Sequence, residues 1–209
     1  MVTAATARGE WSEAARTIAR VAARLFATQG FDATSVRTIV EAAGVTKPTL
    51  YYHFGSKEGL GQALLTMPMV ELAEAMGRHL ESGAGPVATL EGIFEAHFSF
   101  CRENPDGSRF SFALFFGPLG ASLSGELTQY KESLMSLMAE SVRRLVAAGL
   151  VAPERAGTFT AACRGLIVIS MMDFLFHGEE LGPDLARRLV GDLLRGFATS
   201  DAPGQGPRP

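Results

Sequence analysis

A short segment near the N-terminus gathers side chains suited to binding a polyanion. Residues 46–54 read TKPTLYYHF. If the segment is helical, Leu50 and Phe54 share one face. The outer arc then carries Thr46, Lys47, Thr49, Tyr51, Tyr52 and His53. Lysine and tyrosine donate to phosphate or base edges, and a threonine methyl can meet a thymine methyl. The segment predicts a DNA-reading helix, with a plain amphipathic helix as the alternative.

Two flanking helix starts offer further sites for phosphate. A second helix is expected to begin after Thr34, which we predict as its N-cap, followed by Ser35. A fourth helix is expected after Ser56, with Lys57 in its first turn. Free amide protons and the helix dipole favour an anion at such ends. We therefore predict phosphate contacts at Thr34, Ser35 and Lys57.

Three short helices must position these side chains. Apolar residues recur at helical spacing from residue 18 onward, and Gly30 and Gly44 are expected to end the first two helices. Thr46 is a suitable cap for the third helix, and Pro48 falls in its first turn, where a missing amide proton does no harm. This pattern is typical of a helix-turn-helix. Further on, Pro68 should kink or interrupt the fourth helix and is a candidate hinge.

The composition excludes several classes of protein. With 209 residues, 47% hydrophobic and 20% charged, the chain should fold as one small module joined to a larger one. Cys101 and Cys163 can build neither a disulfide framework nor a four-ligand zinc site. The uncharged run 165–172 is too short to cross a bilayer, and residues 1–10 lack a signal peptide's apolar stretch. We expect a cytoplasmic protein without cofactor, metal or membrane partner.

The N-terminal pattern resembles that of the TetR (tetracycline-repressor-like) family of transcriptional regulators. The resemblance covers about Thr17 to Leu65 and includes ARLFATQGFDATSVRTIVEAAGVTKPTLYYHFGSKEGLGQALL. It implies recognition-helix contacts at Thr46, Lys47, Pro48, Thr49, Tyr51, Tyr52 and His53, and flanking phosphate contacts at Thr34 and Lys57. The segment GSKEGL departs from the family's usual SKEEL, and its glycines, Gly59 and Gly61, weaken helix propensity after the cap. This departure bears on local rigidity.

The remainder of the chain is also predicted to be helical, which makes the fold all-α. We expect a disordered N-terminus at 1–10, a helix-turn-helix DNA-binding domain at 11–60, a larger helical effector-binding and dimerisation domain at 61–199, and a disordered tail at 200–209. The larger domain is rich in phenylalanine, with four of the chain's fourteen between residues 110 and 116. Such density predicts either ordinary core or a pocket for a hydrophobic or aromatic effector.

The candidate effector residues are mostly aromatic or sulfur-containing. They are Phe94, His97, Phe98, Cys101, Phe112, Phe115, Phe116, Met138, Phe159, Cys163 and Met171. His97 lies on an apolar face, so it is either a polar anchor for the effector or a core histidine satisfied by a carbonyl, and we favour the second. A metal held by His97 and Cys101 is disfavoured because no further ligand has an evident place beside them.

The predicted helix from Pro153 to about His177 is apolar nearly all round. One stripe includes Phe159 and Cys163, and the opposite side includes Ile169 and Phe176. A helix of this kind must be buried on both sides, so we expect it to pair with the last helix in a four-helix interface between two copies. A fully central helix in a monomer is the alternative.

These features together predict a homodimeric, ligand-responsive regulator, a repressor that binds double-stranded operator DNA and is released by a small, largely apolar effector. The alternative is a helical enzyme or binding protein acting on a small hydrophobic molecule, with His97, Cys101, His177 and the Glu179–Glu180 pair as its reactive groups. No nucleophile with an orienting partner, metal motif or phosphate loop is apparent, so we expect no enzyme.

Overall fold

The computed structural model describes residues 11–116 and 124–197, apart from the side chains at 115, 116, 124–129 and 197. Within these ranges the regular elements are all helices, as predicted. They are α1 (Glu13–Gln29), α2 (Val36–Ala43), α3 (Lys47–Phe54), α4 (Lys57–Glu81), α5 (Pro86–Glu103), α6 (Pro105–Phe116), α7 (Ser124–Ala147), a 3-10 turn (Pro153–Arg155), α8 (Ala156–Met172), a π-helical turn (Asp173–His177) and α9 (Leu185–Phe197). The predicted disordered ends at 1–10 and 200–209 lie outside the described residues.

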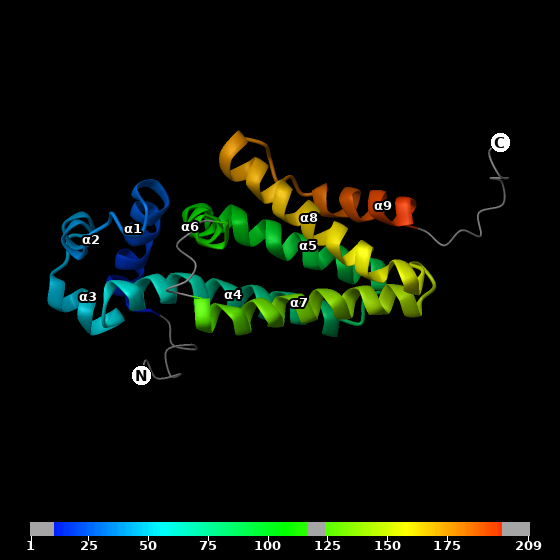
Figure 1. The fold of residues 1–209 in the computed structure, drawn as a ribbon, viewed down its shortest axis with the longest axis horizontal. Coiled ribbons are helices and arrows are strands. Elements are labelled where there is room, and N and C mark those ends of the chain that lie inside the picture. Colours follow the sequence, from blue (N-terminus) through cyan, green and yellow to red (C-terminus); the bar gives the residue numbers. More distant parts are fainter. Residues whose placement is uncertain (1–10, 117–123, 198–209) are drawn as a thin grey trace. The chain divides into compact units, whose positions relative to one another are not determined.

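The chain divides into two compact units, Met1–Glu71 with Glu103–Lys131, and Leu72–Arg102 with Glu132–Pro209. The first contains α1, α2, α3 and α6, and the second contains α5, α8 and α9 (Figure 1). Helices α4 and α7 contribute residues to both. The domain boundary predicted at residue 60 concerns function and stays a prediction.

The predicted turns of the first unit are largely confirmed. Gly30 and Gly44 end α1 and α2 with φ of 87° and 66°, a region of the backbone map that favours glycine. Thr46 caps α3, where its Oγ1 accepts from the Thr49 N–H at 3.4 Å. Ser56 Oγ accepts from the Gly59 N–H at 2.9 Å at the start of α4. Each cap satisfies an amide that helix geometry leaves without a partner.

Two local predictions were wrong. The N-cap of α2 is Ser35, whose Oγ accepts from the Thr38 N–H at 3.1 Å. Thr34 is buried instead, and its hydroxyl donates to the Gly30 carbonyl at 2.7 Å, which closes the turn behind α1. Pro68 does not interrupt α4, which is helical from Lys57 to Glu81, so that of the predicted kink or interruption only the kink stays a prediction.

An aromatic cluster forms the core of the first unit. The ring centroid of Phe26 lies 4.9 Å from that of Phe31 and 5.0 Å from that of Phe110, which joins α1 and α6. Gly61 lies against this cluster, because a Cβ there would sit 2.7 Å from Phe31 Cε2. Gly59 is constrained more strongly, because a Cβ there would clash with the backbone carbonyl oxygen of Phe54. The glycines of GSKEGL therefore allow α4 to pack closely against its neighbours.

We predict opposite effects for two glycine substitutions in α4. Gly59→Ala should lower the free energy of unfolding by about 1–3 kcal/mol, because the methyl group meets a backbone oxygen that cannot move alone. Gly77→Ala should raise it by about 0.5–1 kcal/mol, because nothing lies within 4 Å of the added methyl and alanine favours the helix. Urea denaturation measures both, and equal effects would contradict this packing.

Candidate nucleic-acid interface

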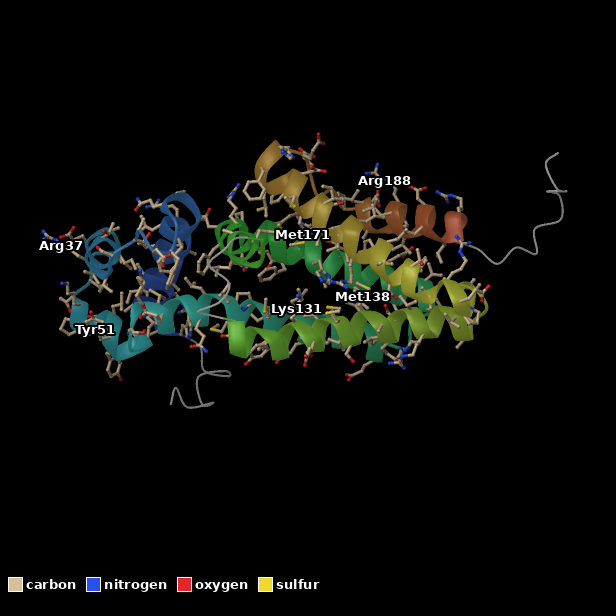
Figure 2. All side chains as sticks on the ribbon, in the orientation of Figure 1. Arg37, Tyr51, Lys131, Met138, Met171 and Arg188 are labelled. Atoms are coloured by element: carbon tan, nitrogen blue, oxygen red, sulfur yellow. The ribbon has the colours of Figure 1, made fainter. Side chains whose placement is uncertain are left out.

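The third helix of the first unit presents a polar edge on a small apolar anchor. Its buried residues are Leu50 and Phe54. Tyr51 and Tyr52 are 47% and 85% exposed, and Lys47 is exposed as well. Figure 2 shows Tyr51 extending outward from α3. The residues that the sequence assigned to the outer arc therefore do lie on the accessible side of the helix.

Two threonine hydroxyl groups at the start of α3 hold each other in place. Thr46 Oγ1 and Thr49 Oγ1 lie 2.9 Å apart, and Thr46 also accepts from the Thr49 amide. Pro48 is exposed in the first turn. Among the described residues, no intramolecular hydrogen bond or ion pair holds the side chain of Lys47 or that of Tyr51. Two long donors are therefore available to an external acceptor beside a pair of ordered hydroxyl groups.

The flanking residues differ in what they present. Ser35 is exposed at the start of α2, and its Oγ lies 2.8 Å from Thr38 Oγ1. The side chain of Thr34 is 1% exposed, so the structure does not bring its hydroxyl to this surface.

The ammonium group of Lys57 already makes hydrogen bonds within the first unit. Its ammonium donates to the carbonyls of Phe31 at 3.0 Å and Thr34 at 3.1 Å, and lies 4.5 Å from the centre of the Phe31 ring. An ammonium has three donors, so one remains for a phosphate. Lys57 thus ties the turn before α2 to the start of α4, a role that its sequence position alone did not reveal.

His53 makes a contact that the sequence pattern did not predict. Its Nε2 lies 3.4 Å from Oγ of Ser12, the residue that caps α1. Beside it, the ring of Trp11 meets that of Phe54 edge to face, with centroids 5.5 Å apart. These residues are separated by about forty positions in the sequence, and no local pattern relates them.

Most of the candidate effector residues of the second unit are buried. Phe94, Phe98, Cys101, Phe159 and Cys163 have no exposed surface, and Met138 and Met171 are buried. Burial raises the pKa of the Cys163 thiol to about 12, so this thiol is inert. Phe112 belongs to the first unit and is partly buried, and the side chains of Phe115 and Phe116 lie outside the described residues.

His97 has the carbonyl partner that we favoured. Its Nδ1 lies 2.8 Å from the Ile93 carbonyl oxygen, which accepts from it. Burial lowers the pKa of His97, and the bond to Ile93 opposes this only in part. The imidazole is therefore neutral, with its proton on Nδ1 and an acceptor lone pair on Nε2.

An open cleft of about 680 Å³ lies elsewhere in the second unit. Its lining comes from α5 and from the segment between α8 and α9, and comprises Glu95, Arg102, Phe174, Glu180, Leu181, Gly182 and Pro183. Arg102 pairs with Glu95 at 2.5 Å and donates to the Leu181 carbonyl at 2.9 Å. None of the predicted effector residues lines this cleft. Within the described ranges, no group of three or more His, Cys, Asp or Glu is placed to hold a metal ion.

A short, capped α3 that follows α2 after a glycine turn, with its polar edge outward, defines a helix-turn-helix protein of the DNA-binding class. Residues 18–64 match the family described as bacterial regulatory proteins, tetR family. The likeness to the tetR family thus covers the helix-turn-helix module.

Curated relatives include two transcriptional repressors called KstR2. That of Mycobacterium tuberculosis is 38% identical over 78 residues, which are 37% of this chain and 39% of the relative. That of Rhodococcus jostii is 30% identical over 130 residues, which are 62% of each chain. These matches thus span less than two thirds of the relatives. Both relatives are described as transcriptional repressors.

Solved structures extend the likeness beyond the N-terminal module. That of AibR in complex with isovaleryl coenzyme A and operator DNA is 21% identical, with a TM-score of 0.66 over 88% of this chain and 98% of AibR. At this identity the likeness concerns the fold alone. Because it covers 88% of this chain, it includes the fold of the second unit.

We predict that Lys57→Met lowers the free energy of unfolding by about 1–2 kcal/mol, because two carbonyls lose a charged donor while the apolar stem is retained. The same change at Lys131, an exposed lysine on α7, is the matched control and should have little effect. Urea denaturation measures both, and equal stabilities of the two variants would show that the Lys57 contacts contribute nothing.

Proposed function

We propose that this regulator is a homodimeric repressor that acts in the bacterial cytoplasm. Two copies of α3 bind operator DNA, and a small, largely apolar effector releases it. The observation that carries the proposal is the outward edge of α3, where Lys47 and Tyr51 extend from a helix anchored by Leu50 and Phe54. The contacts proposed with bases and phosphates are those of Ser35, Thr46, Lys47, Pro48, Thr49, Tyr51, Tyr52, His53 and Lys57.

The charge of residues 1–60 favours this assignment. Residues 1–60 hold seven Lys and Arg against five Asp and Glu, whereas the whole chain has a net charge of -3. Arg16, Arg20 and Arg24 are exposed on successive turns of α1. An excess of positive charge within residues 1–60 steers a polyanion toward the helix-turn-helix module.

The exposed apolar side of α8 supports the dimer. Ile169 is 48% exposed and Phe176 is 53% exposed, although the other side of the helix is fully buried at Phe159 and Cys163. Helix α9 lies beside α8, and Arg155 donates to the Gly196 carbonyl at 3.1 Å (Figure 1). By length and composition alone, Pro153–His177 also passes for a membrane span, as core helices of water-soluble proteins do. A second copy, packed as a four-helix interface, would cover this face.

The relatives support an effector with an apolar part. AibR is described in complex with isovaleryl coenzyme A, which carries a short branched acyl group. In this chain, the only lone pair that His97 can offer is on Nε2, because its Nδ1 proton is committed to Ile93. If His97 anchors the effector, the effector presents a donor such as a hydroxyl or an amide N–H, not a carboxylate.

We predict that Lys47→Ala and Tyr51→Ala abolish operator binding while the dimer persists. The duplex is defined by a DNase footprint on DNA flanking the protein's own gene, repeated with candidate apolar compounds. For about 6–10 phosphate contacts per dimer, log K of the wild-type protein should fall against log salt with a slope of about -5 to -9. Lys131→Ala is the control, and unchanged affinity of the Lys47 and Tyr51 variants would remove the assignment.

We also predict that Ile169→Glu yields a monomer that binds operator weakly. A carboxylate in an apolar interface loses its hydration without gaining a partner, and a monomer has only one α3 to offer. Leu150→Glu is the matched control, because Leu150 is 39% exposed at the end of α7 and outside the proposed interface. Sedimentation velocity measures the mass of each variant, and a dimer that survives Ile169→Glu would place the interface elsewhere.

A further inference from the structure

The recognition helix is tied at its C-terminal end to the residues that precede α1. Helix α3 has eight residues, and its orientation rests on two buried side chains, Leu50 and Phe54. An isolated helix of this length does not hold its shape in water. Whatever covers Phe54 therefore decides how the last turn of α3 is directed.

Trp11 covers Phe54. The two rings meet edge to face, with an interplanar angle of 87° and centroids 5.5 Å apart, which is a favourable arrangement of aromatic quadrupoles. Phe54 itself is almost fully buried. The Trp11 ring is thus part of the wall against which the second anchor of α3 is held.

The position of Trp11 makes this contact distinctive. An apolar residue just before an N-cap commonly packs on the fourth residue of its own helix. Here Ser12 is the N-cap and that fourth residue is Arg16, which is exposed. Trp11 therefore has no apolar partner at the usual place on α1, and its aromatic partner is on α3.

Ser12 adds a polar tie at the same place. Its Oγ accepts from the Ala15 N–H at 3.2 Å and lies 3.4 Å from His53 Nε2. Either atom of the Ser12–His53 pair can be the donor, so the tie is compatible with a neutral or a protonated imidazole. Consecutive residues before α1 thus contact consecutive residues at the end of α3.

We propose that Trp11 and Ser12 are positioning residues for DNA recognition, which clamp the C-terminal turn of α3 through Phe54 and His53. The proposal rests on the proposed function, because the clamp matters only if α3 reads DNA. Trp11 itself donates nothing to the nucleic acid. Its effect is to raise the fraction of molecules in which Lys47 and Tyr51 are directed correctly, and apparent affinity scales with that fraction.

The test compares Trp11→Ala with Trp11→Phe in the full-length dimer. If the alanine variant holds α3 in its competent orientation about a tenth of the time, operator affinity falls about tenfold. The phenylalanine variant keeps an aromatic edge against Phe54 and should restore most of the affinity. Ala27→Gly, which loosens α1 away from α3, is the stability control. The salt slope should stay at the wild-type value, because no phosphate contact is removed.

Two further readouts identify the clamp without DNA. Amide exchange in residues 47–54 should speed up in Trp11→Ala and not in Trp11→Phe. Trp11 is the only tryptophan in the sequence, so its fluorescence reports this contact directly and should change in Phe54→Leu. If Trp11→Ala is too unstable to assay, the comparison of Trp11→Phe with Trp11→Leu decides, because only the former retains the edge-to-face contact.

The outcomes separate the two proposals. Wild-type affinity in Trp11→Ala, or an affinity loss in Trp11→Phe as large as in Trp11→Ala, overturns the clamp; the second result would assign the effect to the indole N–H. A wild-type protein that binds no DNA overturns the proposed function, whereas amide exchange in residues 47–54 still shows whether the clamp exists.

Discussion

The proposed DNA-binding surface of this protein depends on how α3, a helix too short to be stable alone, is held in one orientation. Helix α3 obtains its order from outside itself, through Leu50 and Phe54 in the core and through the Thr46 cap at its start. The geometry of Lys47 and Tyr51 is therefore a property of the whole first unit. This explains why so many of its specific contacts, including Lys57 on the Phe31 and Thr34 carbonyls, fix turns and helix ends rather than add buried area.

Much of this arrangement could be predicted because its causes are local in sequence. The glycines at 30 and 44 and the cap at Thr46 act within a few residues of where they stand, and the fourfold spacing of Leu50 and Phe54 defines a face by itself. The choice between adjacent hydroxyl residues was harder. Thr34 and Ser35 have similar capping chemistry, and only the path of the turn decides that Thr34 is buried on the Gly30 carbonyl while Ser35 caps α2.

The contacts that sequence could not predict are those between segments far apart in the chain. Trp11 and Phe54, or Lys57 and the Phe31 carbonyl, meet because the helices of the first unit pack against one another. The need for glycine at positions 59 and 61 could not be predicted for the same reason, because it depends on the neighbouring atoms that a methyl group would meet. In the second unit, stripes of Phe and Cys predict burial, but they do not distinguish a filled core from a ligand pocket. Phe94, Phe98 and Phe159 are fully buried in this structure, and the open cleft described above is lined by other residues.

In the proposed complex, the outward edge of α3 enters the major groove of the operator twice per dimer. Methylation interference on the footprinted duplex tests this directly, because dimethyl sulfate modifies guanine N7, an acceptor in the major groove. Interference should appear in two clusters whose centres are about one helical turn or a multiple of it apart. A footprint that persists when every guanine N7 is methylated would contradict the account.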